Sequence, residues 1–392
     1  MPAGCWLPSW RRVMPARIRR LRGPASPSGY REDGRLCERS NSEMIADART
    51  ARPGVFVVST GRCGSTMLSN MLRLNPGILS LSEFFSLLMP DPFPAGELDA
   101  AAYWRLLSEP WVFFRHLYRL GLRVPEFLYV PGPGSRFTAA TGIPPILVTA
   151  LPHLSEDPEG LYDEVEAFTA GLTPASAAAQ HRRLIGWLCD RLGARAWVER
   201  SGSSLLYMSQ LAGLFGDARF VHLYRDGREC AYSFSRHPAY RLGALSGMLD
   251  SRLGMSPYLG DDKPPEQVPP DLRPFMPETF DHEAFERFEV SAVESGQFWS
   301  DMIIPALDVL ASLPTERVLQ VSYENLVAEP RQALLRLARF AGLPDTHPGW
   351  LDRAVQLVRP RSPRWTALPQ EQIRELTRVC EPAMRRLYGD SW

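Results

Sequence analysis

Two turns in this 392-residue chain combine residue types that bind phosphate-like anions. The first turn, residues 59–66, follows the apolar run 55–58 and leads into a helical pattern, so a strand, a glycine-rich turn and a helix succeed one another. Unpaired backbone N–H groups and the helix dipole attract an oxyanion at the start of such a helix. Gly61 and Gly64 would let the backbone approach that anion closely.

Side chains of the same turn add further hydrogen-bond donors. Arg62 contributes a permanent cation, and Ser65 and Thr66 contribute hydroxyl groups. A nucleotide-triphosphate loop has Gly, four residues and then Gly-Lys-[Ser/Thr]. Here only two residues separate Gly61 from Gly64, and the lysine is missing. The turn is therefore either an ordinary strand–helix connection or a cradle for a different anion.

A second turn places a cation and a hydroxyl group at a fixed interval. Arg225 ends the apolar run 218–224, and Ser233 follows eight residues later, about two turns into a predicted helix. Together they could clamp a second phosphate. The alternative is that Arg225 forms a surface ion pair with Asp226 or Glu229.

A sheet must hold these turns, and the hydrophobic pattern predicts one. Strands alternate with helices, which indicates a mostly parallel sheet with helices on both faces. Ligands bind beyond the carboxyl ends of such strands, where the turns 59–66, 200–204 and 225–228 would all lie. The predicted strands are 55–58, 78–82, 196–199, 218–224 and 317–321, and the predicted helices include 67–73, 161–168, 177–192, 205–215, 228–234, 282–310 with a kink at Pro305, and 334–340.

The remaining segments suggest one domain with two insertions. Residues 1–50 are rich in arginine and lack periodic apolar positions, so we predict a poorly ordered arm before a single domain at 51–392. Insertions are expected at about 90–190 and 238–280. The first is rich in aromatic residues and would build a substrate pocket or a helical cap. The second is rich in proline and would form a loop acting as a lid.

Composition excludes several classes of protein. The net charge is zero, so nothing draws the whole chain toward nucleic acid. Its 44 basic residues include a single lysine, Lys263, so an anion site must use arginine, hydroxyl and backbone groups. The six cysteines have no zinc-ligand spacing, and no metal is expected. No apolar run is long enough to span a bilayer. A cytoplasmic protein is expected, and no oligomeric state is assigned.

Together the two turns resemble motifs of the sulfotransferases that use 3'-phosphoadenosine 5'-phosphosulfate (PAPS). Residues 60–66 are similar to the family's 5'-phosphosulfate loop, and Arg225 with Ser233 is similar to its 3'-phosphate motif. A third segment, 321–344, resembles the family's "YEdL…P…l…FlGl" pattern. The resemblance implies a P-loop-like, three-layer α/β fold. It also implies a PAPS-binding set consisting of Arg62, Cys63, Gly64, Ser65, Thr66, Arg225 and Ser233.

The chain departs from the cytosolic members of that family in two places. Arg62 stands where many of them carry lysine, although bacterial and carbohydrate sulfotransferases carry arginine there. The C-terminal Arg-Lys-Gly signature is missing, and the arginine-rich residues 359–365 occupy a comparable position. These arginines would supply nucleotide contacts.

The resemblance also implies catalytic roles. Some members use a glutamate just after the first helix as general base, and Glu83 stands there, with His116 and His153 as alternatives. Glu83 could instead be a structural carboxylate paired with an arginine. Arg62 would stabilise charge on the leaving group. Candidates on the substrate side are Arg200, Trp104 and Trp111.

The predicted activity is sulfuryl transfer from PAPS, by in-line displacement, to a hydroxyl or amine group of a small-molecule, lipid or glycan acceptor. Two alternatives remain at this point. One is a P-loop kinase or NTPase, and the other is a catalytically inactive nucleotide-binding scaffold on the same fold.

Overall fold

The computed structural model describes residues 54–261, 265–342, 349–360 and 362–391. Several sequence-based predictions fall outside these ranges: the arm at 1–50, the lysine at 263, the end of the third motif at 343–344, and the arginine at 361.

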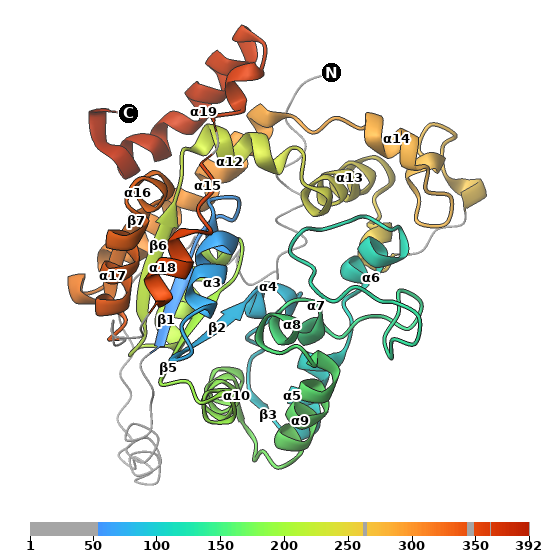
Figure 1. Ribbon diagram of the computed structural model, residues 1–392. Helices are drawn as coiled ribbons and strands as arrows, with labels where there is room; N and C mark the ends of the chain where they lie inside the picture. Colours follow the sequence, from blue (N-terminus) through green and yellow to red (C-terminus); the bar gives the residue numbers. More distant parts are fainter. Residues whose placement is uncertain (1–53, 262–264, 343–348, 361, 392) are drawn as a thin grey trace, which may run out of the picture.

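A parallel five-stranded sheet forms the centre of the described structure (Figure 1). Its strand order is β2-β5-β1-β6-β7, and each neighbouring pair runs parallel. The predicted strands are confirmed, with the bounds β1 (Gly54–Val58), β2 (Ile78–Ser82), β5 (Ala196–Arg200), β6 (Arg219–Tyr224) and β7 (Val318–Ser322). A separate antiparallel pair consists of β3 (Glu97–Leu98) and β4 (Ala175–Ser176).

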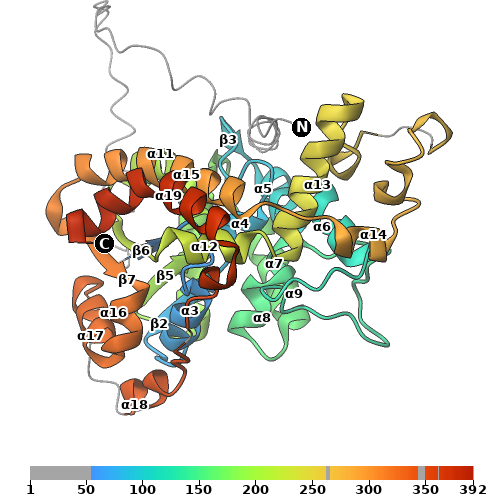
Figure 2. The same ribbon diagram turned by 90° about the horizontal axis from the view of Figure 1, so that it is seen from above.

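The sheet is buried because helices cover both of its faces. In Figure 2, α11, α15 and α19 lie on one side of it, and α3, α17 and α18 lie on the other. Continuous apolar runs such as that of β1 suit a strand buried on both faces. The helices are α3 (Ser65–Arg73), α4 (Phe84–Leu87), α5 (Ala100–Ser108), α6 (Val112–Arg119), α7 (Pro145–Val148), α8 (Ala150–Leu154), α9 (Pro158–Ala170), α10 (Ala177–Leu192), α11 (Met208–Leu214), α12 (Gly227–Phe234), α13 (Pro238–Leu253), α14 (His282–Arg287), α15 (Ala292–Ser312), α16 (Tyr323–Ala328), α17 (Pro330–Phe340), α18 (Trp350–Val355) and α19 (Gln370–Tyr388).

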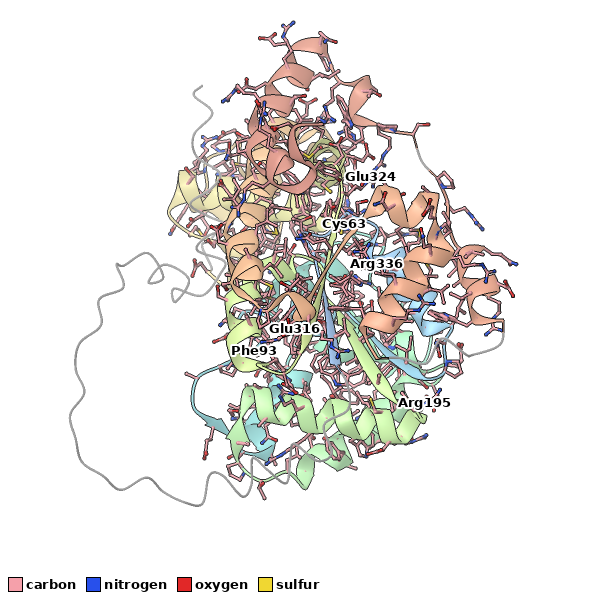
Figure 3. The ribbon with its side chains drawn as sticks, turned by 90° about the vertical axis from the view of Figure 1, so that its left-hand side faces the viewer. Cys63, Phe93, Arg195, Glu316, Glu324 and Arg336 are labelled. Atoms are coloured by element: carbon pink, nitrogen blue, oxygen red, sulfur yellow. The ribbon has the colours of Figure 1, made fainter. Side chains whose placement is uncertain are left out.

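The strand direction sets which turns meet. Figure 3 shows Cys63 and Glu324, which follow β1 and β7, toward one end of the sheet, and Arg195 and Glu316, which precede β5 and β7, toward the other. The turns after β1, β5 and β6 therefore share one edge, as the alternating pattern predicted.

Helices α6, α13 and α14 form a lobe beside the sheet (Figures 1 and 2). This lobe has an apolar core of its own, separate from the core around the sheet. Members of the lobe's core include Phe113, Leu117, Leu245, Tyr258 and Phe285. Because the lobe packs on its own core, it can present one wall of a cavity to the end of the sheet.

Two expectations from the sequence need correction. Residues 238–280 were expected as loop, but residues 238–253 form helix α13, because Pro238 suits the first turn of a helix and Gly254 ends it in a left-handed conformation. The helix expected over 282–310 is two helices, and Pro305 lies inside α15 without ending it. Strand β2 runs parallel to β1 as expected, with β5 between them.

The packing of α12 on α15 gives a test of the fold. A Cβ atom at Gly227 would lie 2.4 Å from the ring of the buried Trp299. We expect Gly227→Ala to lower the free energy of unfolding by about 1–3 kcal/mol, as overpacking does. Urea denaturation would measure this loss. As a control, Gly186→Ala in α10 meets no atom within 4 Å and should stabilise the protein by about 0.5–1 kcal/mol. Equal stability of the Gly227→Ala variant and the wild type would contradict the packing.

Candidate active site

The turns after β1, β5 and β6 line one cavity of about 550 Å³. Hydrogen bonds join the first two turns, since Ser203 Oγ donates to the carbonyl oxygen of Thr60 at 3.1 Å and Ser59 N donates to Ser204 Oγ at 3.0 Å. Arg225, from the third turn, donates to the carbonyl oxygen of Arg62 at 3.5 Å. The three turns predicted to bind ligand therefore meet in space.

The first turn has a backbone conformation that is unusual outside glycine-rich turns. Gly61, Arg62 and Gly64 all adopt positive φ, and Arg62 does so at 59° despite its side chain. Successive amides in such conformations form a concave anion-binding surface. Ser65 and Thr66 follow at the start of α3, and both line the cavity.

Gly64 is required for contact with the far edge of the sheet. Its φ is 86°, and a Cβ atom there would lie 2.5 Å from Cδ2 of Tyr323, at the start of α16. Cys63, which precedes Gly64 in the chain, is fully buried, and burial raises the pKa of its thiol. The Cys63 thiol is therefore a core group, so any contact from this residue to a ligand in the cavity would come from its backbone.

Arg225, two residues before α12, and Ser233, within α12, both line the cavity. The guanidinium of Arg225 stacks on the ring of Tyr323, 4.1 Å from its centroid, and lies 3.6 Å from a carboxylate oxygen of Glu229. Glu229 is buried and also accepts hydrogen bonds from Arg364 Nε at 3.0 Å and from Arg364 N at 2.7 Å. One buried carboxylate thus positions two cavity arginines. The Arg225–Glu229 pair proposed as an alternative does form, but in the interior.

Part of the arginine-rich segment near the C-terminus lies at the cavity. Among its described residues, Arg359 and Arg364 line the cavity beside Leu357. The neighbouring Arg228 instead pairs with Asp226 at 2.7 Å and stacks on Trp365, 4.1 Å from the ring centroid.

Glu83 lines the cavity at the end of β2, in a left-handed conformation with φ of 57°. Its carboxylate is held by an ion pair with Arg200, by a hydrogen bond from Ser86 Oγ and by one from Gly202 N at 2.8 Å. The pairing with an arginine considered from the sequence is therefore present. A carboxylate has about four acceptor positions, so these three partners leave one of them for a ligand.

The substrate-side candidates separate in space. Trp111 lines the cavity, whereas Trp104 packs against Tyr162 with ring centroids 4.9 Å apart and is not among the lining residues. Arg200 is buried beneath the cavity in its pair with Glu83. The alternative bases also lie elsewhere: His116 packs on Tyr258, and His153 lies 3.3 Å from Ser69 Oγ.

A second group of polar residues lines the cavity, and no sequence motif predicted it. Glu126, after α6, forms an ion pair with Arg62, and its other oxygen lies 2.9 Å from Nε2 of His237. Burial would raise the pKa of Glu126, but the hydrogen bond and charge of His237 and the charge of Arg62 outweigh it and lower the pKa to about 2. Glu126 is therefore a carboxylate at neutral pH.

Tyr240 completes this group. Its hydroxyl lies 2.7 Å from Ser203 Oγ, and burial raises its pKa above the ordinary value. Arg62 reaches the same region and donates from Nε to Ser233 Oγ at 3.0 Å. The folding of α13 brings these residues together, with His237 at its N-cap. Tyr240 lies in the stretch 238–280 that was expected as loop.

Two general features concern the described ranges only. They contain no cluster of three or more His, Cys, Asp or Glu residues able to hold a metal ion. None of their helices combines the length and the apolar character needed to cross a membrane.

Three of the solved structures that match this chain are two sulfotransferases and a retinol dehydratase. The sulfotransferase domain from the curacin biosynthetic pathway is 17% identical, with a TM-score of 0.40, and the match covers 84% of this chain and 97% of that one. A sulfotransferase from Mycobacterium avium is 16% identical, with a TM-score of 0.41 and coverages of 89% and 80%. Retinol dehydratase in complex with retinol and PAP is 13% identical, with a TM-score of 0.32 and coverages of 88% and 86%.

Family models give a direct assignment. No curated protein sequence matches the chain. A model described as a sulfotransferase domain matches residues 206–365, and one described as the sulfotransferase family matches residues 53–250, about half of the chain. The match over residues 53–250 includes the turn at 59–66 and the residues from Arg225 to Ser233. The chain therefore belongs to the sulfotransferase family.

Proposed function

We propose that this protein transfers a sulfuryl group from PAPS to a hydroxyl or amine group of an acceptor. The observation that carries the proposal is that two anion-binding sites line a single cavity: the amide-rich turn at residues 61–66, and Arg225 with Ser233. PAPS carries anionic groups at two separated positions, the 5'-phosphosulfate and the 3'-phosphate. A nucleotide triphosphate has its charge in one chain and would leave the second site without a partner.

The residues present fit PAPS by charge and by shape. Arg62 and the N–H groups before α3 would hold the 5'-phosphosulfate, and Arg225 and Ser233 would hold the 3'-phosphate. Arg359 and Arg364 add two more cations at the cavity wall. Arg62 is bound by Glu126 in the described structure, so the phosphosulfate would take the place of that carboxylate.

In the proposed reaction, PAPS supplies the sulfuryl group. The acceptor oxygen forms a bond to sulfur, the bond from sulfur to the bridging phosphate oxygen breaks, and PAP leaves with that electron pair. Arg62, Ser65 and Thr66 stabilise the negative charge that develops on the leaving oxygen. Most of the rate enhancement then comes from positioning and electrostatics, as in phosphoryl transfer.

Glu83 is the proposed general base that accepts the proton of the acceptor hydroxyl. Three hydrogen-bonding partners orient its carboxylate at the cavity surface, and Gly202 places it beside the turn after β5. The ion pair with Arg200 holds the base in place. Its proximity to the phosphosulfate loop supports this role over the two histidines, which do not line the cavity.

The cavity walls support a small-molecule or lipid acceptor. Trp111, Phe114 and Phe127 line the cavity, and a sugar would need more polar partners beside them. We further propose that residues 51–392 act as one catalytic domain, with the lobe of α6, α13 and α14 forming its acceptor side.

The clamp on the 3'-phosphate can be tested with two nucleotides. We expect Arg225→Ala to weaken PAP binding by about tenfold or more, because a charge-assisted hydrogen bond contributes about 1.5–3 kcal/mol. Binding of adenosine 5'-phosphosulfate, which has no 3'-phosphate, should change little. Calorimetric titration measures both affinities, and Arg228→Ala serves as a control arginine outside the cavity. Equal losses for the two nucleotides would rule out the clamp.

The role of Glu83 can be tested by separating kcat from donor affinity. Glu83→Gln preserves the side-chain shape but cannot take up a proton, so kcat should fall by about 10²–10⁴-fold. Affinity for PAP should stay nearly unchanged, which single-turnover transfer and calorimetry would establish together. A variant that retains more than about a tenth of wild-type kcat would exclude Glu83 as the base. Parallel losses of kcat, PAP affinity and melting temperature would assign it a structural role through Arg200.

A further inference from the structure

Helix α13 contributes one wall of the cavity. His237 at its N-cap, then Tyr240, Gly243 and Ser246 within the helix, line the cavity, and we call this row of four residues the α13 face. Five buried side-chain atoms of the described residues have no hydrogen-bond partner, and two of the five belong to this face: Nδ1 of His237 and Oγ of Ser246. The other three atoms belong to residues that do not line the cavity.

The hydroxyl group of Ser246 has no structural explanation. A serine inside a helix normally points to solvent or donates to the carbonyl oxygen four residues earlier. Ser246 is 2% exposed, and its Oγ makes neither contact among the described residues. Leaving a buried hydroxyl unpaired costs about 1–3 kcal/mol. Rotation about χ1 would let this hydroxyl bond an oxygen atom of a ligand in the cavity.

The other end of the same face lies where sulfuryl transfer is proposed to occur. Tyr240 bonds Ser203, the neighbour of Gly202, which donates to Glu83. Because Glu126 is ionised, its carboxylate accepts a hydrogen bond from Nε2 of His237. A reacting hydroxyl at this end of α13 therefore lies beside the carboxylate of Glu83, which also lines the cavity.

Between the two ends, the residues of α13 and of the α6 segment that line the cavity are small or apolar. On α13 these are Ala239 and Gly243, between the polar positions. Trp111 and Phe114 of the α6 segment, and Leu259, which follows α13 in the chain, line the same cavity. Figures 1 and 2 both show α6 beside α13. A lining of this kind suits a hydrocarbon chain.

We propose that the acceptor is an elongated apolar alcohol with a second oxygen at its far end, and that Ser246 hydrogen-bonds this second oxygen. The proposal rests on the sulfuryl transfer proposed above: the near hydroxyl oxygen forms the bond to sulfur, its proton passes to Glu83, and PAP leaves. Nine residues separate His237 from Ser246, which at about 1.5 Å per residue is a rise of about 13 Å. With C–C bonds of about 1.5 Å, an extended chain of about ten carbons spans this length.

Matched diols and alcohols test this spacing. We would measure kcat/KM for 1,10-decanediol and 1-decanol, and for 1,6-hexanediol and 1-hexanol, with PAPS as donor. The ratio of diol to alcohol cancels the difference in apolar area. For the ten-carbon pair we expect a ratio of about 10 or more after correction for the two equivalent hydroxyls, as for a gain of one buried hydrogen bond. For the six-carbon pair the corrected ratio should be about 1, because the shorter chain cannot reach Ser246.

Two variants of α13 test whether Ser246 causes the preference for the ten-carbon diol over the alcohol. Ser246→Ala should bring the ten-carbon ratio to about 1 while leaving kcat/KM for 1-decanol within about twofold of wild type. Ser251→Ala, the same substitution on the exposed side of the same helix, should leave the ratio unchanged.

Each of the other outcomes overturns a specific part of the proposal. A ten-carbon ratio near 1 in the wild type, or an equal loss for both ligands in Ser246→Ala, overturns the role of Ser246. If the protein binds PAP but neither binds nor sulfates the ten-carbon probes, the acceptor class is wrong while the proposed function stands. If the protein fails to bind PAP, the proposed function itself fails.

Discussion

The ring of Tyr323 lies between the two proposed anion-binding sites and contacts both. The ring packs against Gly64, where a Cβ atom would collide with it, and the guanidinium of Arg225 lies 4.1 Å from its centroid. The proposed phosphosulfate loop and the proposed 3'-phosphate clamp therefore contact the same rigid side chain, which begins the helix after β7. A flexible residue in this position would let the two sites move independently, and a donor with two anionic ends requires a fixed separation.

Carboxylates control the positions of the arginines around this ring. Arginines that converge on an empty cavity repel one another, and each has many side-chain conformations to lose. Three acidic residues limit both effects by holding particular arginines: Glu126 holds Arg62, Glu229 holds Arg225 and Arg364, and Glu83 holds Arg200. The pairs made by Glu229 fix Arg225 and Arg364 in place. The pair made by Glu126 instead occupies Arg62, which the proposed donor would bind.

Two separate apolar cores support the two sides of the cavity. The larger core holds the parallel sheet and, through it, the three turns that form the donor side. The smaller core holds α6, α13 and α14, which contribute the aromatic and small-residue walls of the acceptor side. Substitutions in the second core can reshape the acceptor wall without moving the turns, since packing defects act mainly on their neighbours.

The sequence by itself determined the strands and the turns of the proposed donor side, because their signals are local. Periodicity identified the five strands, and turn residues such as Gly61, Gly64 and Arg225 stand directly after them. In a parallel sheet the ends of β1, β5 and β6 must share an edge, so those residues could be brought together without knowing any distant contact.

Only the tertiary structure decided the acceptor side. Helix α13 was expected as loop, since Pro238 and the glycines at 243 and 247 weaken its helical pattern, while packing of Leu242, Leu245 and Leu249 into the lobe's core stabilises it. Glu126 and His237 lie 111 residues apart in the chain and meet through this packing. No local pattern can encode such a meeting, because the energy that forms it comes from burial of apolar surface between segments far apart in sequence.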